Sequence, residues 1–354
     1  MSDLTPFQFS INPGRVVFGP GSSGQTADEI RGLGLARVLV LATPFQKRQA
    51  EDLSAALGPL SAGVFAEAAM HTPVDVTDRA MAAYEASGAE GVLALGGGST
   101  IGLGKAIAHR NGAPQIVVAT TYAGSEVTPI LGQTENGIKT TVRGPGILPE
   151  VVIYDPDLTL GLPVAMSVAS GLNAMAHAVE GLYAQDRNPV SSLQAVEGIR
   201  ALRDALPVIV QEPEDRGARG EALYGAWLCG TVLGTVGMSL HHKLCHVLGG
   251  SFDLPHAETH AIMLPHTAAF NEVAAKEALA PAAALFGGSL GGGLHDFAGS
   301  IGAPQALKDL GLEEASLERA TEIATKNPYW NPRPVEAEGI RALLQRAWEG
   351  SRPE

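Results

Sequence analysis

The chain has 354 residues, which is long for one ordinary domain and suits two. Hydrophobic residues make up 45% of it and charged residues 17%, so a large core can form. The formal net charge is −13 and no basic block is present, which argues against nucleic acid and anionic membrane surfaces as partners.

The cysteines and the first residues bear on the compartment. Only Cys229 and Cys245 are present, so no disulfide framework is implied and a reducing compartment is the default. The opening residues, MSDLTPFQFSINPGRVVFGPG, lack a basic head followed by an apolar stretch, so we expect no signal peptide. No uninterrupted apolar run approaches the roughly 20 residues of a membrane helix. The sequence therefore predicts a cytoplasmic protein.

Short runs of branched residues alternate with alanine-rich stretches over residues 1–160. The predicted strands are 37–42, 91–95, 115–119 and 151–154, and the predicted helices between them are 50–57 and 76–87. Buried strands that alternate with helices predict a parallel, Rossmann-like sheet with helices on both faces. We therefore expect an α/β domain over residues 1–160.

The pattern changes after Pro163, where long segments rich in alanine and leucine begin. The predicted helices are 166–183, 189–209, 220–249 and 261–286, and further helices broken by glycine and proline over 296–348. The glycine-rich segment 287–293 is predicted to be a flexible loop. Residues 161–354 are expected to form an all-α substrate and catalytic domain, with the site in the cleft between the two domains.

A glycine loop, GGGST at 96–100, follows the second predicted strand and opens a helix. This placement brings unhindered backbone N–H groups to a helix N-terminus, where a pyrophosphate is stabilised. The motif is not G-x-G-x-x-G, because Ile101 stands where the third glycine belongs. It is not a P-loop either, because Ala106 follows Lys105. A glycine-rich turn without a ligand remains the alternative.

A second loop, TTYAGSEVT at 120–128, follows the next predicted strand and is rich in hydroxyl groups. Because ligands of open α/β sheets bind where the strands end, the two loops together favour a dinucleotide site. The first predicted strand ends at Thr43, where many dinucleotide sites have an acidic residue for the ribose, so NADH and NADPH both stay open. Lys105 is expected to meet the phosphates or the ribose, as is Lys139. The candidate cofactor-binding residues are Thr43, Gly97, Gly98, Ser99, Thr120, Thr121 and Lys139.

The predicted helical domain carries histidines at helical spacing. Asn173 and His177 stand four residues apart on one predicted helix, and His242 and His246 do so on another. A glycine pair is predicted to end that second helix and to let His256 return to the same place. Converging imidazoles bind metal, transfer protons or hold a polar ligand, whereas any one of them alone can be a hydrogen-bonded structural histidine.

These motifs together resemble those of the iron-type alcohol dehydrogenase superfamily, which is related in fold to glycerol dehydrogenase and dehydroquinate synthase. The glycine loop, the TT…GSEVT loop, DPDLT at 155–159 and HHKLCHVLGG…PHAETHA at 241–261 stand in the family's order along nearly the whole chain. The resemblance implies a nicotinamide-dependent oxidoreductase that binds a small molecule and forms a homodimer.

The metal-dependent branch of this superfamily binds a divalent metal through one aspartate and three histidines. The matching positions in this chain are Asn173, His177, His242 and His256. A carboxamide thus replaces the carboxylate, which weakens the binding of a hard cation, and no metal is expected. Gly102 also replaces an aspartate of that branch. With the segment NPYWNPRPVE at 327–336, these departures make the chain most similar to the maleylacetate reductase branch.

That branch implies reduction of the C=C bond of maleylacetate to 3-oxoadipate by NADH or NADPH, late in bacterial degradation of aromatic compounds. Hydride addition to an alkene conjugated with a ketone gives an enolate, so the site must stabilise an oxyanion and supply a proton. Preorganised hydrogen-bond donors can each contribute ~3–4 kcal/mol to this. The hypothetical donor set is His177, His242, His246 and His256, with the proton donor among them left open. Lys243 and Arg143 are the candidates for binding the two substrate carboxylates.

Three alternatives remain at this point. The first is a metal-dependent alcohol or polyol dehydrogenase in which Asn173 still serves as a ligand. The second is a cyclase like dehydroquinate synthase, whose sites are richer in lysine and arginine than this one. The third is a nucleotide-sensing or structural relative without activity, which the retention of the cofactor loops and the histidines disfavours.

Overall fold

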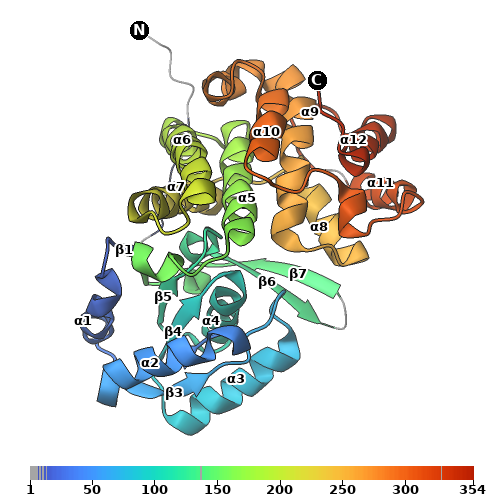
Figure 1. The fold of residues 1–354 in the computed structure, drawn as a ribbon. Coiled ribbons are helices and arrows are strands. Elements are labelled where there is room, and N and C mark those ends of the chain that lie inside the picture. Colours follow the sequence, from blue (N-terminus) through green and yellow to red (C-terminus); the bar gives the residue numbers. More distant parts are fainter. Residues whose placement is uncertain (1–6, 8, 10–11, 13, 136–137, 328) are drawn as a thin grey trace. The chain divides into compact units, whose positions relative to one another are not determined.

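The computed structural model describes residues 7, 9, 12, 14–135, 138–327 and 329–354 (Figure 1). The chain divides into two compact units. Ile11–Leu162 forms the first, and Pro163–Glu354 belongs to the second. The first combines a sheet with helices and the second is all-helical, so the predicted fold class is confirmed.

Six parallel strands form the sheet of the α/β unit. In pairing order they are β1 (Arg15–Phe18), β8 (Val151–Tyr154), β5 (Gln115–Ala119), β4 (Gly91–Gly96), β2 (Val38–Leu41) and β3 (Ser61–Phe65). The four inner strands lie where the sequence predicts them. The two edge strands were not predicted, because each buries only one residue, Val17 in β1 and Phe65 in β3, and so lacks a clear apolar pattern.

Helices cover both faces of this sheet, as predicted. They are α1 (Thr26–Gly32), α2 (Lys47–Leu57), α3 (Val74–Ser87) and α4 (Gly98–Asn111). Successive strand residues point to opposite faces, so Val40 packs in one cluster with Ile30 of α1, whereas Leu41 packs in another with Leu103 of α4. A separate antiparallel hairpin, β6 (Ile130–Glu135) and β7 (Ile138–Arg143), was not predicted.

The strand order reverses direction between β2 and β4. From β2 the chain runs outward to β3 and then returns past β2 to β4 and β5. In open α/β sheets, the carboxyl ends of the strands at such a reversal are where ligands bind. The loops that begin at Thr43 and Gly97 therefore flank the expected binding position.

The helical unit is built around α5, in which every residue from 167 to 182 is buried. It packs against α6, α7 and α9. The helices of this unit are α5 (Val164–Leu182), α6 (Pro189–Gln211), α7 (Arg216–Thr235), α8 (Leu240–Phe252), α9 (His256–Leu285), α10 (Leu290–Ser300), α11 (Ser316–Lys326) and α12 (Ala337–Glu349). A helix that is buried on all sides lies in a core, and α5 occupies that position.

The single helix predicted over 220–249 is wrong. The chain breaks after Thr235, and α7 and α8 meet at an angle of 97°. Tertiary hydrogen bonds hold the break open, because the Gly237 N–H donates to Asp186 and the Ser239 hydroxyl donates to the Trp330 carbonyl. Within the described residues no single helix is long and apolar enough to cross a membrane, and only this bent pair meets those criteria jointly.

Two predictions based on glycine-rich segments also need correction. The pair at 249–250 does not end α8, which continues to Phe252 and stops at Asp253, a residue with φ +55°. The segment 287–293 is only partly a loop, because α10 begins at Leu290. The Glu272 carboxylate accepts hydrogen bonds from the Leu290 and Gly291 N–H groups and so fixes that helix start.

Close packing of α6 and α7 generates a stability prediction. A Cβ at Gly225 would lie 3.0 Å from the Gly198 carbonyl oxygen and 2.8 Å from Leu202 Cγ. We expect Gly225→Ala to lower the free energy of unfolding by about 1–3 kcal/mol, because the helices must move apart. The control is Gly250→Ala, where a Cβ meets nothing within 4 Å and helix propensity favours alanine by up to ~1 kcal/mol. Equal stability of the two variants in urea unfolding would contradict the prediction.

Candidate functional site

The loops after β2, β4 and β5 are tied together by hydrogen bonds. The Gln46 side-chain amide donates to Thr120 Oγ1 at 3.0 Å, and the Thr120 N–H donates to the Gly96 carbonyl at 3.0 Å. Thr43 precedes the short turn that carries Gln46 and donates to its amide oxygen at 3.4 Å. The candidate residues Thr43 and Thr120 thus belong to one connected edge of the sheet.

The glycine loop also approaches the threonine loop closely at Gly97. Gly97 precedes the first turn of α4, and a Cβ there would lie 2.6 Å from Thr121 Oγ1. Gly98 is exposed, with nothing within 4 Å of the place of a Cβ, and Ser99 follows it half-buried. The N-terminus of a fourteen-residue helix therefore stands beside open space, which is the arrangement that binds a diphosphate.

The expectation that Lys105 meets a phosphate is wrong. Its buried ammonium donates to the carbonyls of Ser125, Thr128 and Ile130 and to Thr128 Oγ1, which pins the loop after β5. Burial lowers the pKa of Lys105 to about 7, and the buried Glu126 opposes that shift. Lys139 lies in β7, and its side chain is outside the described residues.

In the helical unit, α5, α8 and α9 bring the predicted histidines into one cluster. His177 and His242 are buried and stacked, with ring centroids 5.0 Å apart and His177 Nδ1 3.0 Å from His242 Nε2. Asn173 is buried one turn before His177, and its Oδ1 accepts no hydrogen bond from any described residue. His256 opens α9 and is half-buried.

A carboxylate that was not predicted, Glu180, organises this cluster. It is fully buried on α5 and accepts a short hydrogen bond from His242 Nδ1. It also accepts from the His241 N–H at 2.8 Å, the His242 N–H at 3.3 Å and the Tyr183 hydroxyl at 3.3 Å. Glu180 therefore caps the N-terminus of α8, where a negative charge is stabilised, and orients the His242 ring. The signal that could have revealed it is its position three residues after His177 on the same helix.

These bonds assign the hydrogens on the two stacked rings. A carboxylate only accepts, so His242 Nδ1 carries the hydrogen and its Nε2 offers a lone pair. That lone pair accepts from His177 Nδ1. The result is a relay that runs from Glu180 through His242 to His177.

A second chain of hydrogen bonds runs beside the first. Thr267 Oγ1 donates to the Met263 carbonyl at 2.9 Å and accepts from His241 Nδ1 at 2.9 Å. His241 Nε2 then accepts from His260 Nδ1 at 2.9 Å. Burial and the neighbouring histidines lower the pKa of both His241 and His260 well below the usual value, so both rings are neutral.

The remaining predicted residues are His246, Lys243 and Arg143. His246 is exposed, with its ring centroid 6.2 Å from that of His242. Lys243 is half-buried, and its ammonium lies 5.9 Å from the centre of the Tyr329 ring. Arg143 is exposed at the end of β7 in the α/β unit. His260 and His241 join the cluster although neither was among the predicted site residues.

The chain thus combines an α/β unit, whose glycine and threonine loops meet at one edge of the sheet, with an all-helical unit that has a polar centre. A model of the iron-containing alcohol dehydrogenases matches residues 13–156, and one of the C-terminal part of the Fe-containing alcohol dehydrogenase family matches residues 167–348. The chain belongs to this iron-containing alcohol dehydrogenase family, and it is an oxidoreductase.

Similar proteins match over the full length. The chain is 67% identical to a maleylacetate reductase of a Rhizobium species over 99% of this chain and 100% of that one. It is 52% identical to a maleylacetate reductase of Sphingobium indicum over 98% and 99% of the two chains. The crystal structure of maleylacetate reductase from Agrobacterium tumefaciens superposes with a TM-score of 0.97 at 66% identity, covering 99% and 100% of the chains.

The contact between the two loops of the α/β unit generates a prediction for cofactor binding. We expect Gly97→Ala to raise the dissociation constant of NADH or NADPH at least about tenfold, because the new methyl group displaces Thr121 from its place beside α4. Gly104→Ala is the matched control on the same helix, since its Cβ would meet only ordinary contacts at 3.6 Å or more. Titration of the cofactor fluorescence measures both, and unchanged affinity in Gly97→Ala would contradict the prediction.

His266 generates a prediction for the pH dependence of stability. His266 is buried, and neither of its ring nitrogens has a hydrogen-bond partner among the described residues. Burial lowers its pKa to about 3. Below the ordinary histidine pKa of about 6.5 the unfolded chain therefore binds a proton that the folded chain does not. As the pH drops below about 6.5, this group therefore lowers the free energy of unfolding by about 1.4 kcal/mol for each pH unit.

We expect His266→Phe to reduce the loss of stability between pH 7 and pH 5 by about 2 kcal/mol. Urea unfolding at both pH values measures it. His109→Gln, which removes an exposed histidine from α4, is the matched control. If His266→Phe and the unaltered protein lose the same stability over this range, the assigned pKa is wrong.

Proposed function

We propose that the chain reduces the carbon–carbon double bond of maleylacetate to give 3-oxoadipate, with NADH or NADPH as hydride donor and without a metal ion. Support for the substrate comes from full-length relatives with this activity in their names, at 67% and 52% identity. The observation that carries the metal-free mechanism is the relay from Glu180 through His242 to His177. The cytoplasmic location and the homodimer stay predictions.

The residues at the family's metal positions do not fit a divalent ion. Asn173 supplies an uncharged oxygen in place of a carboxylate, which weakens the binding of a hard cation. Within the described part of the chain, His177, His242 and His256 do not form a group whose ligand atoms come within 4.8 Å of one another. The proposed mechanism therefore uses no metal ion.

The relay suits the chemistry that the reaction needs. Hydride transfer to the conjugated alkene leaves an enolate, which must be stabilised and then protonated on carbon. A proton bound by the His177 imidazole gives an imidazolium whose charge is stabilised through His242 by the buried Glu180 carboxylate. We propose that His177 and His242 hold the reaction's proton, and that His246 and His256 complete the donor set.

Lys243 and Arg143 are proposed to bind the carboxylates of the substrate. Maleylacetate carries two carboxylates, and Lys243, next to His242 and over the Tyr329 ring, is proposed to bind one of them. Arg143 is proposed for the other. On the α/β unit we propose that Gly97, Gly98 and Ser99 hold the diphosphate, with Thr43, Thr120, Thr121 and Lys139 around the rest of the cofactor.

The function is tested directly by turnover. Chelator-treated protein with maleylacetate is expected to oxidise NADH or NADPH at full rate, because the relay replaces the Lewis acid. Absorbance of the nicotinamide follows the reaction, and elemental analysis of the same sample measures residual metal. Turnover that appears only after Zn²⁺ or Fe²⁺ is added, or only with simple aldehydes, would instead favour a metal-dependent alcohol dehydrogenase.

Glu180 provides the sharper test of the relay. We expect Glu180→Gln to lower kcat by about 10²–10⁴-fold with little change in KM, since the amide cannot hold the same His242 tautomer. The matched control is Glu272→Gln, which alters another carboxylate that caps a helix start, that of α10. If both variants keep full kcat, the relay does not act in catalysis.

A further inference from the structure

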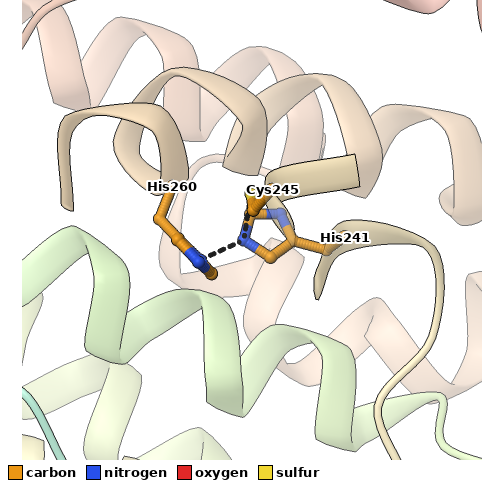
Figure 2. Close-up of side chains that lie close together, drawn as sticks. All are labelled: His241, Cys245 and His260. Atoms are coloured by element: carbon orange, nitrogen blue, oxygen red, sulfur yellow. Dashed lines mark hydrogen bonds between the residues drawn. The ribbon is translucent and has the colours of Figure 1, made fainter. Parts of the chain in front are cut away.

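A group of metal-ligating side chains lies beside the proposed donor set and is not used by the proposed function. His241 and Cys245 stand one turn apart on α8, and His260 reaches them from α9 (Figure 2). One ligand atom from each of the three lies within 4.8 Å of the others. Among the described residues, no other trio of histidine, cysteine, aspartate or glutamate side chains meets this spacing. We call these three residues the His–Cys–His group.

The distances in this group are close to those around a bound ion. His241 Nε2 is the central atom, 3.6 Å from Cys245 Sγ and 2.9 Å from His260 Nδ1. In tetrahedral zinc sites with bonds of about 2.0–2.3 Å, neighbouring ligand atoms are roughly 3.3–3.8 Å apart. The cysteine–histidine pair already has that separation, and the two histidines need to open by only a few tenths of an ångström.

His241 also has the outer hydrogen bond that metal-binding histidines need. Its Nδ1 donates to Thr267 Oγ1, and that hydroxyl is itself fixed by donating to the Met263 carbonyl. This arrangement sets the tautomer and the ring orientation and points the Nε2 lone pair at Cys245 and His260 (Figure 2). Outer partners of this kind typically change metal affinity by 10–100-fold.

His260 also has an unsatisfied ring nitrogen. His260 is fully buried, and its Nε2 has no hydrogen-bond partner among the described residues. Buried polar atoms are nearly always paired, so a lone one calls for an explanation. Both histidines are neutral because burial lowers their pKa, and the neutral ring is the form that binds metal.

We propose that the His–Cys–His group binds one thiophilic metal ion of the zinc class, at a site separate from Asn173, His177, His242 and His256. A thiolate with two imidazoles favours such a soft ion over the hard cations that carboxylates hold. On binding, the Cys245 thiol releases its proton to solvent. His260 keeps its single proton on whichever ring nitrogen does not bind the ion.

Occupancy of this site has a consequence for the neighbouring relay. The ion replaces the hydrogen bond between His260 and His241, so the His260 ring must shift. That ring contacts His256 and His242, with centroids 4.4 Å and 5.2 Å away. The bound ion therefore disturbs the proposed donor set, and we expect it to inhibit the oxidoreductase rather than to support it.

Cadmium is the probe that separates this site from any site built only of nitrogen and oxygen. Full-length protein, freed of metal, is titrated with Cd²⁺ while the ultraviolet thiolate-to-cadmium absorption band is followed, and Zn²⁺ is then used as competitor. We expect the band to saturate at one ion per chain and Zn²⁺ to abolish it. Cys245→Ser is expected to lose the band, whereas Cys229→Ser, which alters the other buried cysteine, is expected to keep it.

Thr267→Val tests the site without touching a ligand. It keeps the cysteine and both histidines but removes the hydroxyl that fixes His241, so we expect the Cd²⁺ affinity to fall by about 10–100-fold. Circular dichroism confirms that each variant is folded, and this variant stands in if Cys245→Ser is not. Three results would overturn the proposal: Cd²⁺ binding without a thiolate band, a band that follows Cys229, or unchanged affinity in Thr267→Val.

Discussion

The burial of one carboxylate, Glu180, is the constraint on which the rest of the helical unit depends. A buried charge is tolerated only where hydrogen bonds replace water, and Glu180 accepts four of them. Two come from the first backbone N–H groups of α8, so the carboxylate also fixes where that helix begins. The orientation of the His242 ring follows from the same group.

This constraint links the fold to the proposed chemistry. In an enzyme that polarises its substrate with a metal, the ion itself aligns the histidines around it. Here the alignment comes from hydrogen bonds, because Glu180 orients His242 and His242 orients His177. Asn173 fits this account, since an aspartate at that buried position would add a second buried negative charge without a cation to balance it.

The sequence predicted the parts of the molecule that depend on local pattern. The four inner strands, the glycine loop after β4 and the threonine loop after β5 were found because apolar runs and turn residues mark them directly. Three features were missed because they depend on contacts between distant segments. Glu180 and His242 are 62 residues apart in the sequence, and Ser239 and Trp330 are 91 residues apart. Lys105 donates to a loop carbonyl 20 residues further along the chain. Helix propensity alone cannot show such pairings.

The most direct test of the account is the protonation pattern of the histidine rings. Nitrogen-15 NMR of histidine-labelled protein, assigned by single substitutions, reports which ring nitrogen of each residue carries the hydrogen. The account predicts hydrogen on Nδ1 of both His242 and His177. Hydrogen on Nε2 of His242 would contradict it, because Glu180 would then not orient the relay.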